Sequence, residues 1–292
     1  MSKKEIKERA KRAAAMLERC TLCPRECDVN RLSGEKGFCR GGYLARVYSF
    51  APHFGEEAPL VGTQGSGTIF FSGCNLGCVY CQNYEISQLD QGTEVSAQEL
   101  AKIMLYLQRK GCHNINFVTP THFVPQILES LAIAKEMGLN VPLVYNCGGY
   151  ESVETLRLLE GIFDIYMPDI KYGSDQAGLK YSKAKDYFSR AKDAVREMHR
   201  QVGDLQIENG LAKRGLLVRH LVLPEGLAGT EEVVRFLSGL SDKTYLNVTS
   251  QYHPAHRACD HHEISRRINS REYLGASNLA REAGLARGLE DY

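Results

Sequence analysis

Short apolar stretches alternate with helical patterns along most of the chain. The stretches are rich in β-branched and aromatic residues, as are strands buried on both faces of a sheet; they cover residues 68–71, 115–118, 141–145, 162–167, 216–222 and 245–248. Helical spacing of apolar residues occurs between most of them, at 95–110, 124–137, 187–202 and 230–240. Units of about 30 residues are typical of βα repeats with a parallel sheet. Six such units fall two short of a closed eight-stranded barrel, so the pattern predicts an open barrel or a doubly wound sheet.

The segments that follow these strands should meet at one edge of the sheet, where parallel α/β folds bind their ligands. They are residues 74–81, 119–122, 146–149, 169–171, 224–226 and 251–253. A helix is expected over residues 3–19, and Ser277 is expected to begin a closing helix. A glycine-rich stretch over 55–67 suggests a domain boundary. We therefore predict an N-terminal segment over residues 1–60 and a barrel with a C-terminal helical tail over 61–292.

The ten cysteines are clustered rather than scattered. Cys74, Cys78 and Cys81 lie in the first post-strand segment at the spacing C-x3-C-x2-C. Three thiolates can bind three irons of a [4Fe–4S] cluster and leave the fourth iron without a protein ligand. An open position of this kind is what a catalytic metal site keeps for its substrate. The alternative is a structural zinc loop with a fourth ligand from elsewhere in the chain.

A second cysteine group precedes the first strand. Cys20, Cys23, Cys27 and Cys39 lie close together in a stretch rich in charge, Pro and Gly. Four cysteines at short spacing indicate a metal site, which fits either a second [4Fe–4S] cluster or a structural zinc ion. A set of redox-active thiols is the third alternative. Metal binding by such a segment would be coupled to its folding.

Composition and charge indicate in which compartment the protein works and which partners its charge does not favour. Lys and Arg total 36 against 35 Asp and Glu, so the whole-chain charge gives no nucleic-acid signal. No apolar run approaches the roughly 18 residues of a membrane-spanning helix, and the charged N-terminus lacks the apolar core of a secretion signal. We therefore expect a cytoplasmic protein, in which clustered cysteines bind metal more often than they form disulfides.

The sequence GSGTIFFSGCNLGCVYCQNYEIS around the first cysteine group resembles the radical S-adenosylmethionine (SAM) superfamily. Together with CTLCPRECDVNRLSGEKGFCR, it is similar to a branch named for its likeness to pyruvate formate-lyase activating enzymes. The resemblance implies a partial (β/α)6 TIM-type barrel with an N-terminal Cys-rich metal-binding extension. It also implies a [4Fe–4S] cluster on the C-x3-C-x2-C cysteines, with the SAM amino and carboxylate groups on its open iron. Reductive cleavage of SAM would then give a 5′-deoxyadenosyl radical, which abstracts hydrogen from a substrate.

Further site residues follow from the same resemblance. Tyr80 matches the aromatic residue near the adenine, and Asp169 and Lys171 match a Met-x-Asp-x-Lys sequence close to SAM in the activating enzymes. Arg219 matches a barrel arginine, whose guanidinium suits a carboxylate. His253 matches a histidine after the sixth strand. The alternatives are an internal Asp–Lys ion pair and a purely structural histidine.

The chain departs from the activating enzymes at two places. They carry Gly-Gly-Glu after the second strand, where this chain has Thr119 and Thr121, whose hydroxyls are candidate acceptors for the SAM amino group. After the third strand, Asn146 replaces an Asp and keeps an oxygen acceptor without its charge. The expected cofactor-binding residues are Tyr80, Thr119, Asn146 and Asp169. The expected catalytic residues are Lys171, Arg219 and His253.

Three functional classes are compatible with these patterns. The resemblance favours a radical SAM enzyme that forms a glycyl radical on a partner enzyme. The two departures and the extra cysteine site favour a radical SAM enzyme that acts on a small molecule, an RNA or another peptide. A non-catalytic iron–sulfur or zinc protein is the third class. Either enzyme would require a one-electron donor such as flavodoxin or ferredoxin. Fold likeness alone does not choose the substrate.

Overall fold

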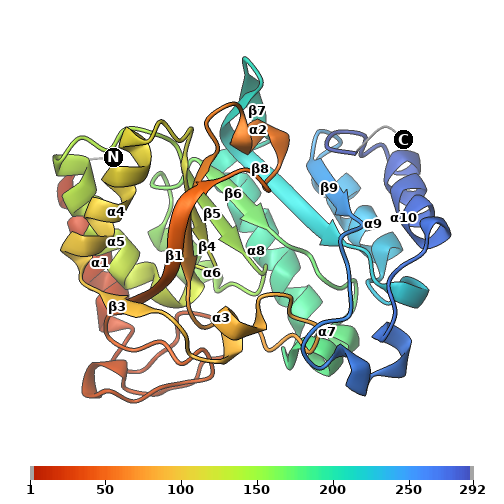
Figure 1. Cartoon of the computed structure of the whole chain (residues 1–292), viewed down its shortest axis with the longest axis horizontal. Coiled ribbons are helices and arrows are strands. Elements are labelled where there is room, and N and C mark those ends of the chain that lie inside the picture. Colours follow the sequence, from red (N-terminus) through yellow and green to blue (C-terminus); the bar gives the residue numbers. More distant parts are fainter. Residues whose placement is uncertain (1–2, 290–292) are drawn as a thin grey trace.

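The strands form one curved, open sheet (Figure 1). The computed structural model describes residues 3–289. Six strands pair in parallel, in chain order: β2 (Ser66–Phe71), β4 (Ile115–Val118), β5 (Leu143–Cys147), β6 (Ile165–Pro168), β8 (Leu211–Leu221) and β9 (Tyr245–Thr249). A doubly wound sheet reverses its strand order at a switch point, and these strands do not. Within residues 3–289 no ladder joins β9 to β2, so the barrel stays open. The predicted partial (β/α)6 barrel is confirmed.

Helices cover the outer side of the sheet, to the left, behind and to the right in Figure 1. Four of them lie where apolar spacing predicted them: α4 (Ala97–Arg109), α5 (Val124–Glu136), α8 (Tyr187–Val202) and α9 (Thr230–Leu240). The start of α4 is fixed by a capping box, in which Ser96 accepts the Glu99 N–H and Glu99 accepts the Ser96 N–H. Its inward residues Leu100, Met104 and Leu107 are fully buried.

Three strands beyond the parallel set were not predicted. β1 (Ala45–His53) runs antiparallel to β2, and β3 (Thr93–Val95) pairs with β1. β7 (Gln206–Glu208) forms a hairpin with the start of β8. Most β1 residues after Val47 are partly or fully exposed, so the strand carries no buried apolar pattern. The boundary near residue 60 stays a prediction, although β1 on one side of it pairs with β2 on the other.

The remaining helices are shorter or peripheral. α1 (Lys3–Ala15) packs on α5 through Ile6, Ala10 and Ala13, and α6 (Val153–Leu158) connects β5 to β6. The single-turn to two-turn helices are α2 (Ala58–Val61), α3 (Tyr84–Gln88) and α7 (Asp175–Ser182). Of the helices in the described range, none has the length and apolar character that crossing a membrane requires.

The closing helix begins earlier than expected. α10 covers Ser270–Glu282, so the prediction that Ser277 starts it was wrong. Asn269 caps the helix: its side chain accepts the Glu272 N–H, and Glu272 accepts the Asn269 N–H. Ser277 lies inside the helix and is 2% exposed. The Asn-x-x-Glu sequence of this capping box predicts the start of the helix, whereas apolar spacing alone does not.

Candidate active site at the carboxyl edge of the sheet

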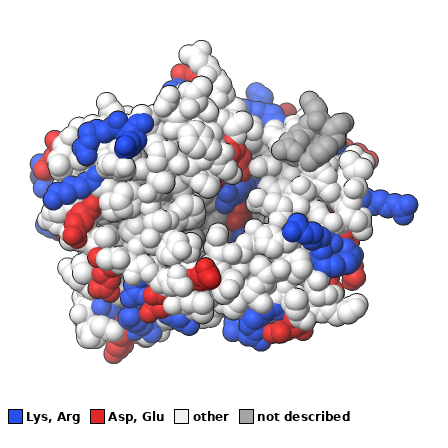
Figure 2. Space-filling view, in the orientation of Figure 1, with Lys and Arg blue, Asp and Glu red and all other residues white. Residues whose placement is uncertain are grey.

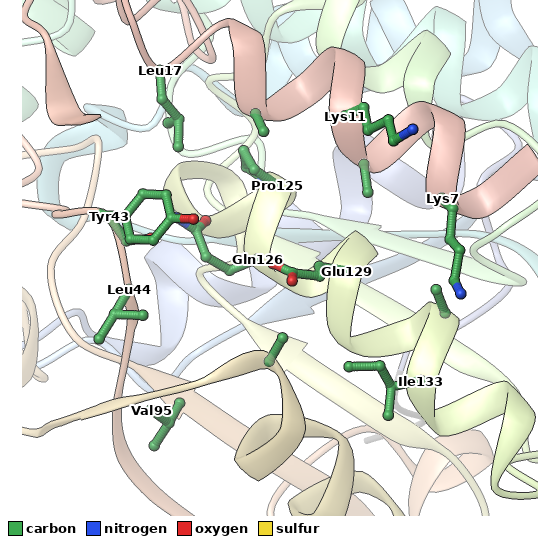
Figure 3. Close-up of a pocket in the computed structure, with 14 residues that line it drawn as sticks. Lys7, Lys11, Leu17, Tyr43, Leu44, Val95, Pro125, Gln126, Glu129 and Ile133 are labelled. Carbon is green, nitrogen blue, oxygen red and sulfur yellow. The ribbon is translucent and has the colours of Figure 1, made fainter.

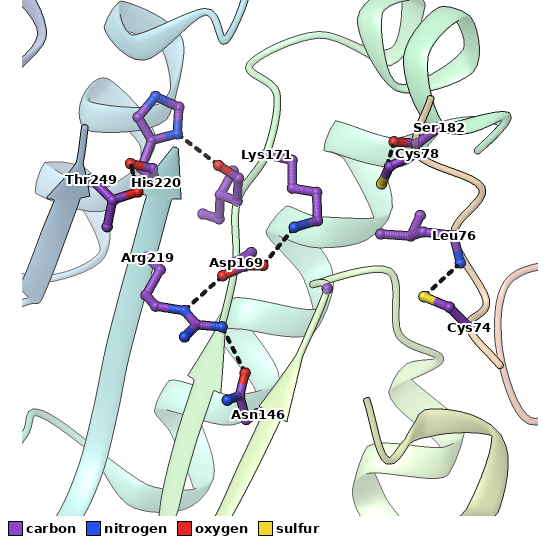
Figure 4. A network of polar contacts seen from close by, with 12 residues as sticks. Cys74, Leu76, Cys78, Asn146, Asp169, Lys171, Ser182, Arg219, His220 and Thr249 are labelled. Carbon is purple, nitrogen blue, oxygen red and sulfur yellow. Dashed lines mark hydrogen bonds and ion pairs between the residues drawn. The ribbon is translucent and has the colours of Figure 1, made fainter. Parts of the chain in front are cut away.

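The loop that leaves β2 brings its three cysteines to the carboxyl edge of the sheet. Cys78 and Cys81 line a cavity of about 300 Å³. Each sulfur has a hydrogen-bonding neighbour. The Leu76 N–H lies 3.3 Å from Cys74 Sγ, and the Ser182 hydroxyl donates to Cys78 Sγ over 2.9 Å (Figure 4). Cys81 Sγ lies 3.2 Å from the Ser87 hydroxyl oxygen. Burial raises the pKa of the Cys78 thiol to about 11, an effect that the Lys171 ammonium opposes.

Two glycines allow this loop to sit against the N-terminal segment. Gly73 has a φ of +83°, and a Cβ there would lie 2.3 Å from the Cys39 carbonyl oxygen. A Cβ on Gly77 would lie 2.9 Å from the Phe38 ring. Any side chain at Gly73 would therefore force the backbone of the two segments apart.

Opposite the cysteine loop, charged side chains from separate strands form one network (Figure 4). Asp169 accepts from Lys171 Nζ at 2.6 Å and from Arg219 Nε at 2.8 Å. Arg219 also donates to the Asn146 side-chain oxygen at 2.7 Å and lies 3.3 Å from a Glu56 oxygen. Burial opposes ionisation of Asp169, but the Arg219 and Lys171 charges outweigh it and hold the Asp169 pKa at about 2. All five residues line the same cavity as Cys78 and Cys81. Figure 2 shows basic and acidic side chains side by side in the hollow near the centre of this face.

The structure brings some predicted site residues to this cavity and leaves others away from it. Tyr80 lines it, with its ring buried edge-on against Tyr252 and Tyr172. Thr119 and His253 are not among its lining residues. Thr119 has a φ of +58°, and its N–H donates to the Asn146 carbonyl oxygen over 2.8 Å.

Two acidic residues near the strand ends were missed by sequence reasoning, of which Glu56 lines the cavity and Glu151 does not. Glu56, between β1 and α2, reaches Arg219, although its glycine-rich surroundings suggested only a boundary. Glu151 follows β5 and is 2% exposed. Its carboxylate accepts from the Thr121 and Tyr145 hydroxyls at 2.7 and 3.0 Å. Burial raises the Glu151 pKa to about 7. The sequence signal that could have identified Glu151 is its position four residues after the end of β5.

Comparison with known proteins shows the family. The family model described as the radical SAM superfamily matches residues 68–208. The uncharacterized protein MJ0674 of Methanocaldococcus jannaschii is 34% identical over 285 residues, which cover 94% of this chain and 77% of that protein. The chain belongs to the radical SAM superfamily. Enzymes of this superfamily use a [4Fe–4S] cluster and SAM.

More distant relatives agree with this membership. The pyruvate formate-lyase-activating enzyme of Clostridium pasteurianum is 27% identical over 206 residues, covering 68% of this chain and 76% of that enzyme. The crystal structure of methylornithine synthase superposes with a TM-score of 0.51 at 14% identity, covering 99% of this chain and 71% of that one. At this identity the superposition shows a shared fold alone.

The thiols and polar groups of this radical SAM protein fit the cofactors of its superfamily. Burial is the largest cause that raises the pKa of the Cys74 thiol, and Cys78 and Cys81 lie close enough to raise it further by their charge. Within residues 3–289 no three His, Cys, Asp or Glu side chains are placed to hold a single metal ion. A cluster binds each thiolate to a different iron atom, so its ligands surround a volume instead of converging on one point.

The N-terminal cysteines of this radical SAM protein also come together. Cys20, Cys23, Cys27 and Cys39 line one small enclosed cavity, together with Arg31 and His122. Burial is the main cause that raises the pKa values of the Cys23 and Cys39 thiols.

A separate recess lies on the outer side of the barrel, between α1 and α5 (Figure 3). Its volume is about 480 Å³, and its lining is mostly apolar, with Tyr43 and Leu44 at one side and Lys7 and Lys11 at another. It contains none of the cysteines and none of the charged network. The carboxyl edge of the sheet is therefore the candidate active site.

Proposed function

We propose that this chain is a SAM-cleaving enzyme whose [4Fe–4S] cluster is held by Cys74, Cys78 and Cys81. The observation that carries the proposal is that the cysteine loop and the Asp169 network border one cavity. When bound, the cluster supplies the electron for reductive cleavage of SAM to methionine and a 5′-deoxyadenosyl radical. The protein contributes the orientation of SAM and the exclusion of water from the radical.

The charged network is suited to hold the methionyl end of SAM. Every nitrogen of the Arg219 guanidinium already has an oxygen partner, so this residue fixes Asp169 and Asn146 in place. Lys171 uses one ammonium hydrogen on Asp169 and retains two for a SAM carboxylate. Asp169 retains acceptor positions for the SAM amino group. A network set before SAM arrives orients SAM without reorganisation.

The remaining predicted residues have less direct roles in this proposal. Tyr80 forms an aromatic wall for the adenine, because its ring borders the cavity beside Cys81. Thr119 acts through its backbone bond to Asn146. His253 is proposed for the substrate side, since its neighbour Gln251 lines the cavity.

Two substrate classes remain, and each has one supporting observation. Similarity to the Clostridium pasteurianum activating enzyme supports formation of a glycyl radical on a partner enzyme. A second, largely polar cavity of about 480 Å³ supports a polar small molecule or a peptide segment. The second cavity shares Glu56, Arg219 and Gln251 with the first. Its carboxylates Glu56 and Glu57 repel phosphates and so disfavour an RNA substrate.

The chemistry also requires a supply of electrons. We propose a one-electron donor such as flavodoxin or ferredoxin. A cluster with an exposed iron is sensitive to oxygen, which favours the reducing cytoplasm as the place of action. We further propose that Cys20, Cys23, Cys27 and Cys39 hold a second metal centre, either a second [4Fe–4S] cluster or zinc.

The test is anaerobic reconstitution with iron and sulfide, followed by measurement of 5′-deoxyadenosine from SAM with dithionite as reductant. We expect Cys78→Ala to abolish the product. Cys112→Ala is the matched control, because Cys112 is also buried but does not line the cavity, and this variant should retain the product. Product formation by Cys78→Ala would refute the cluster assignment. A glycyl-radical electron paramagnetic resonance signal on added pyruvate formate-lyase would favour the first substrate class, and its absence the second.

A further inference from the structure

The N-terminal cysteine segment is part of the wall behind the catalytic loop. The Cys39 carbonyl oxygen packs against Gly73 so closely that no Cβ fits between them. Arg25 Nε donates to the Asn75 carbonyl oxygen over 2.8 Å, and the Arg25 guanidinium lies 3.6 Å above the Phe38 ring. The four-cysteine cavity therefore lies directly behind the loop that carries Cys74.

A buried cation borders this cavity without a matching carboxylate. Arg31 is 1% exposed. Its guanidinium donates to the carbonyl oxygens of Gly42 and His122, and it lies 3.9 Å from Cys20 Sγ. Among the described residues, no carboxylate is a hydrogen-bond or ion-pair partner of Arg31. A buried charge is costly without an opposite charge, and thiolates bound to a metal would supply it.

A buried histidine borders the same cavity with one ring nitrogen unused. His122 is 1% exposed, and its Nε2 lies 2.8 Å from the Ser72 carbonyl oxygen. A carbonyl oxygen only accepts, so Nε2 carries the hydrogen and Nδ1 carries a lone pair. Nδ1 is buried and has no hydrogen-bond partner among the described residues.

This arrangement is the one that metal-binding histidines adopt. Such a histidine commonly donates its other ring N–H to a carboxylate or a backbone carbonyl, which fixes the tautomer and the ring orientation. In His122 the backbone carbonyl is that of Ser72, two residues before Cys74. A thiol S–H or an Arg31 N–H could donate to this lone pair, but neither does so among the described residues. Metal coordination is therefore the interaction that we assign to Nδ1 in a cavity lined by cysteines.

We propose that the four-cysteine cavity is a metal site with mixed sulfur and nitrogen ligands, in which His122 Nδ1 binds the metal. The inference rests on the second metal centre proposed above and adds a fifth donor to its four thiols. Arg31 is a positioning residue, which balances the negative charge and holds the His122 backbone. Because no three His, Cys, Asp or Glu side chains of residues 3–289 converge on one point, these donors fit a cluster, which binds each ligand through a different iron atom, better than a single zinc ion.

The test uses the full chain with Cys74, Cys78 and Cys81 all changed to Ala, so that only the N-terminal site can load. The protein is reconstituted separately with iron and sulfide and with zinc, and the bound metal is counted. X-ray absorption at the edge of the bound metal then identifies its ligands. We expect sulfur at about 2.3 Å and one nitrogen shell at about 2.0 Å. We expect His122→Phe to remove the nitrogen shell. The ligand measurement does not depend on the proposed SAM cleavage, because this variant lacks Cys74, Cys78 and Cys81.

The control is His262→Phe, since His262 is exposed and does not line the cavity. It should leave the nitrogen shell unchanged. A sulfur-only spectrum in the parent protein would overturn the proposal even if His122→Phe fails to fold. Failure to bind either metal would overturn it as well, as would a nitrogen shell that survives in a folded His122→Phe protein.

Discussion

Replacing Asp169 by Asn tests whether the charged network is assembled before any ligand binds. The change keeps the shape of the side chain and one acceptor oxygen, but it removes the negative charge between Arg219 and Lys171. Both cationic side chains are only about one fifth exposed, at 21% and 18%. Each would then lose its closest anionic partner while remaining largely out of water.

The size of the effect can be estimated in two ways. The pKa of Asp169, about 2 against 3.8 for a free side chain, corresponds to about 2 kcal/mol of stability. Removing one partner of a buried ion pair costs roughly 3–5 kcal/mol. The second value is an upper bound here, because the pair retains some solvent contact. We expect Asp169→Asn to lower the free energy of unfolding by about 2–4 kcal/mol near pH 7.

The assay is urea unfolding of the metal-free protein under reducing conditions, at several pH values. Because the pKa of Asp169 is lowered in the folded state, its contribution is present above about pH 4 and is lost as the pH falls toward 2. The difference between wild type and variant should shrink over that range. Asp193→Asn is the control: its ion pair with Arg196 is more than half exposed, so a change below about 0.5 kcal/mol is expected. Equal effects of the two variants near pH 7 would refute a preassembled network.

Two further substitutions probe the neighbourhood of the site. Burial raises the Glu151 pKa to about 7, so its protonated form stabilises the fold at low pH and this stability is lost as the pH rises from about 4.5 to 7. Glu151→Gln should abolish this dependence and be about 1–3 kcal/mol more stable than wild type at pH 8; an unchanged pH profile in urea unfolding would contradict the protonated assignment. Gly73→Ala should lower the unfolding free energy by roughly 2 kcal/mol or more, through strain at positive φ plus the clash with Cys39. Gly138→Ala, at a φ of +94° with open space around it, should cost only the strain, about 1 kcal/mol, and equal melting temperatures for the two variants would exclude the clash.

Local patterns were sufficient for the features that repeat along the chain. Apolar stretches predict the six buried strands, and the strand ends predict the shared edge at which Asn146, Asp169 and Lys171 lie. The choice of these three residues as site residues comes from the family resemblance. The same patterns could not reveal β1, whose residues are mostly exposed and whose pairing is made by backbone groups. They also could not reveal Glu56 or His122, whose partners lie 163 and 50 residues away in sequence. Partners at such separations are chosen by the folded backbone and leave no local pattern.

The contact between Cys39 and Gly73 bears on how the two cysteine sites mature. The N-terminal segment is synthesised first, yet the histidine at its cavity belongs to the strand-end loop after β4 and must be made about eighty residues later than Cys39. The lining of the four-cysteine cavity is therefore incomplete until the first two of the six parallel strands, β2 and β4, have been made. Conversely, the loop that carries Cys74 lacks one of its packing contacts until the N-terminal segment has folded, because Gly73 packs against the Cys39 carbonyl oxygen. Each cysteine group packs against residues of the other segment, so the two groups should reach their final geometry in one folding event.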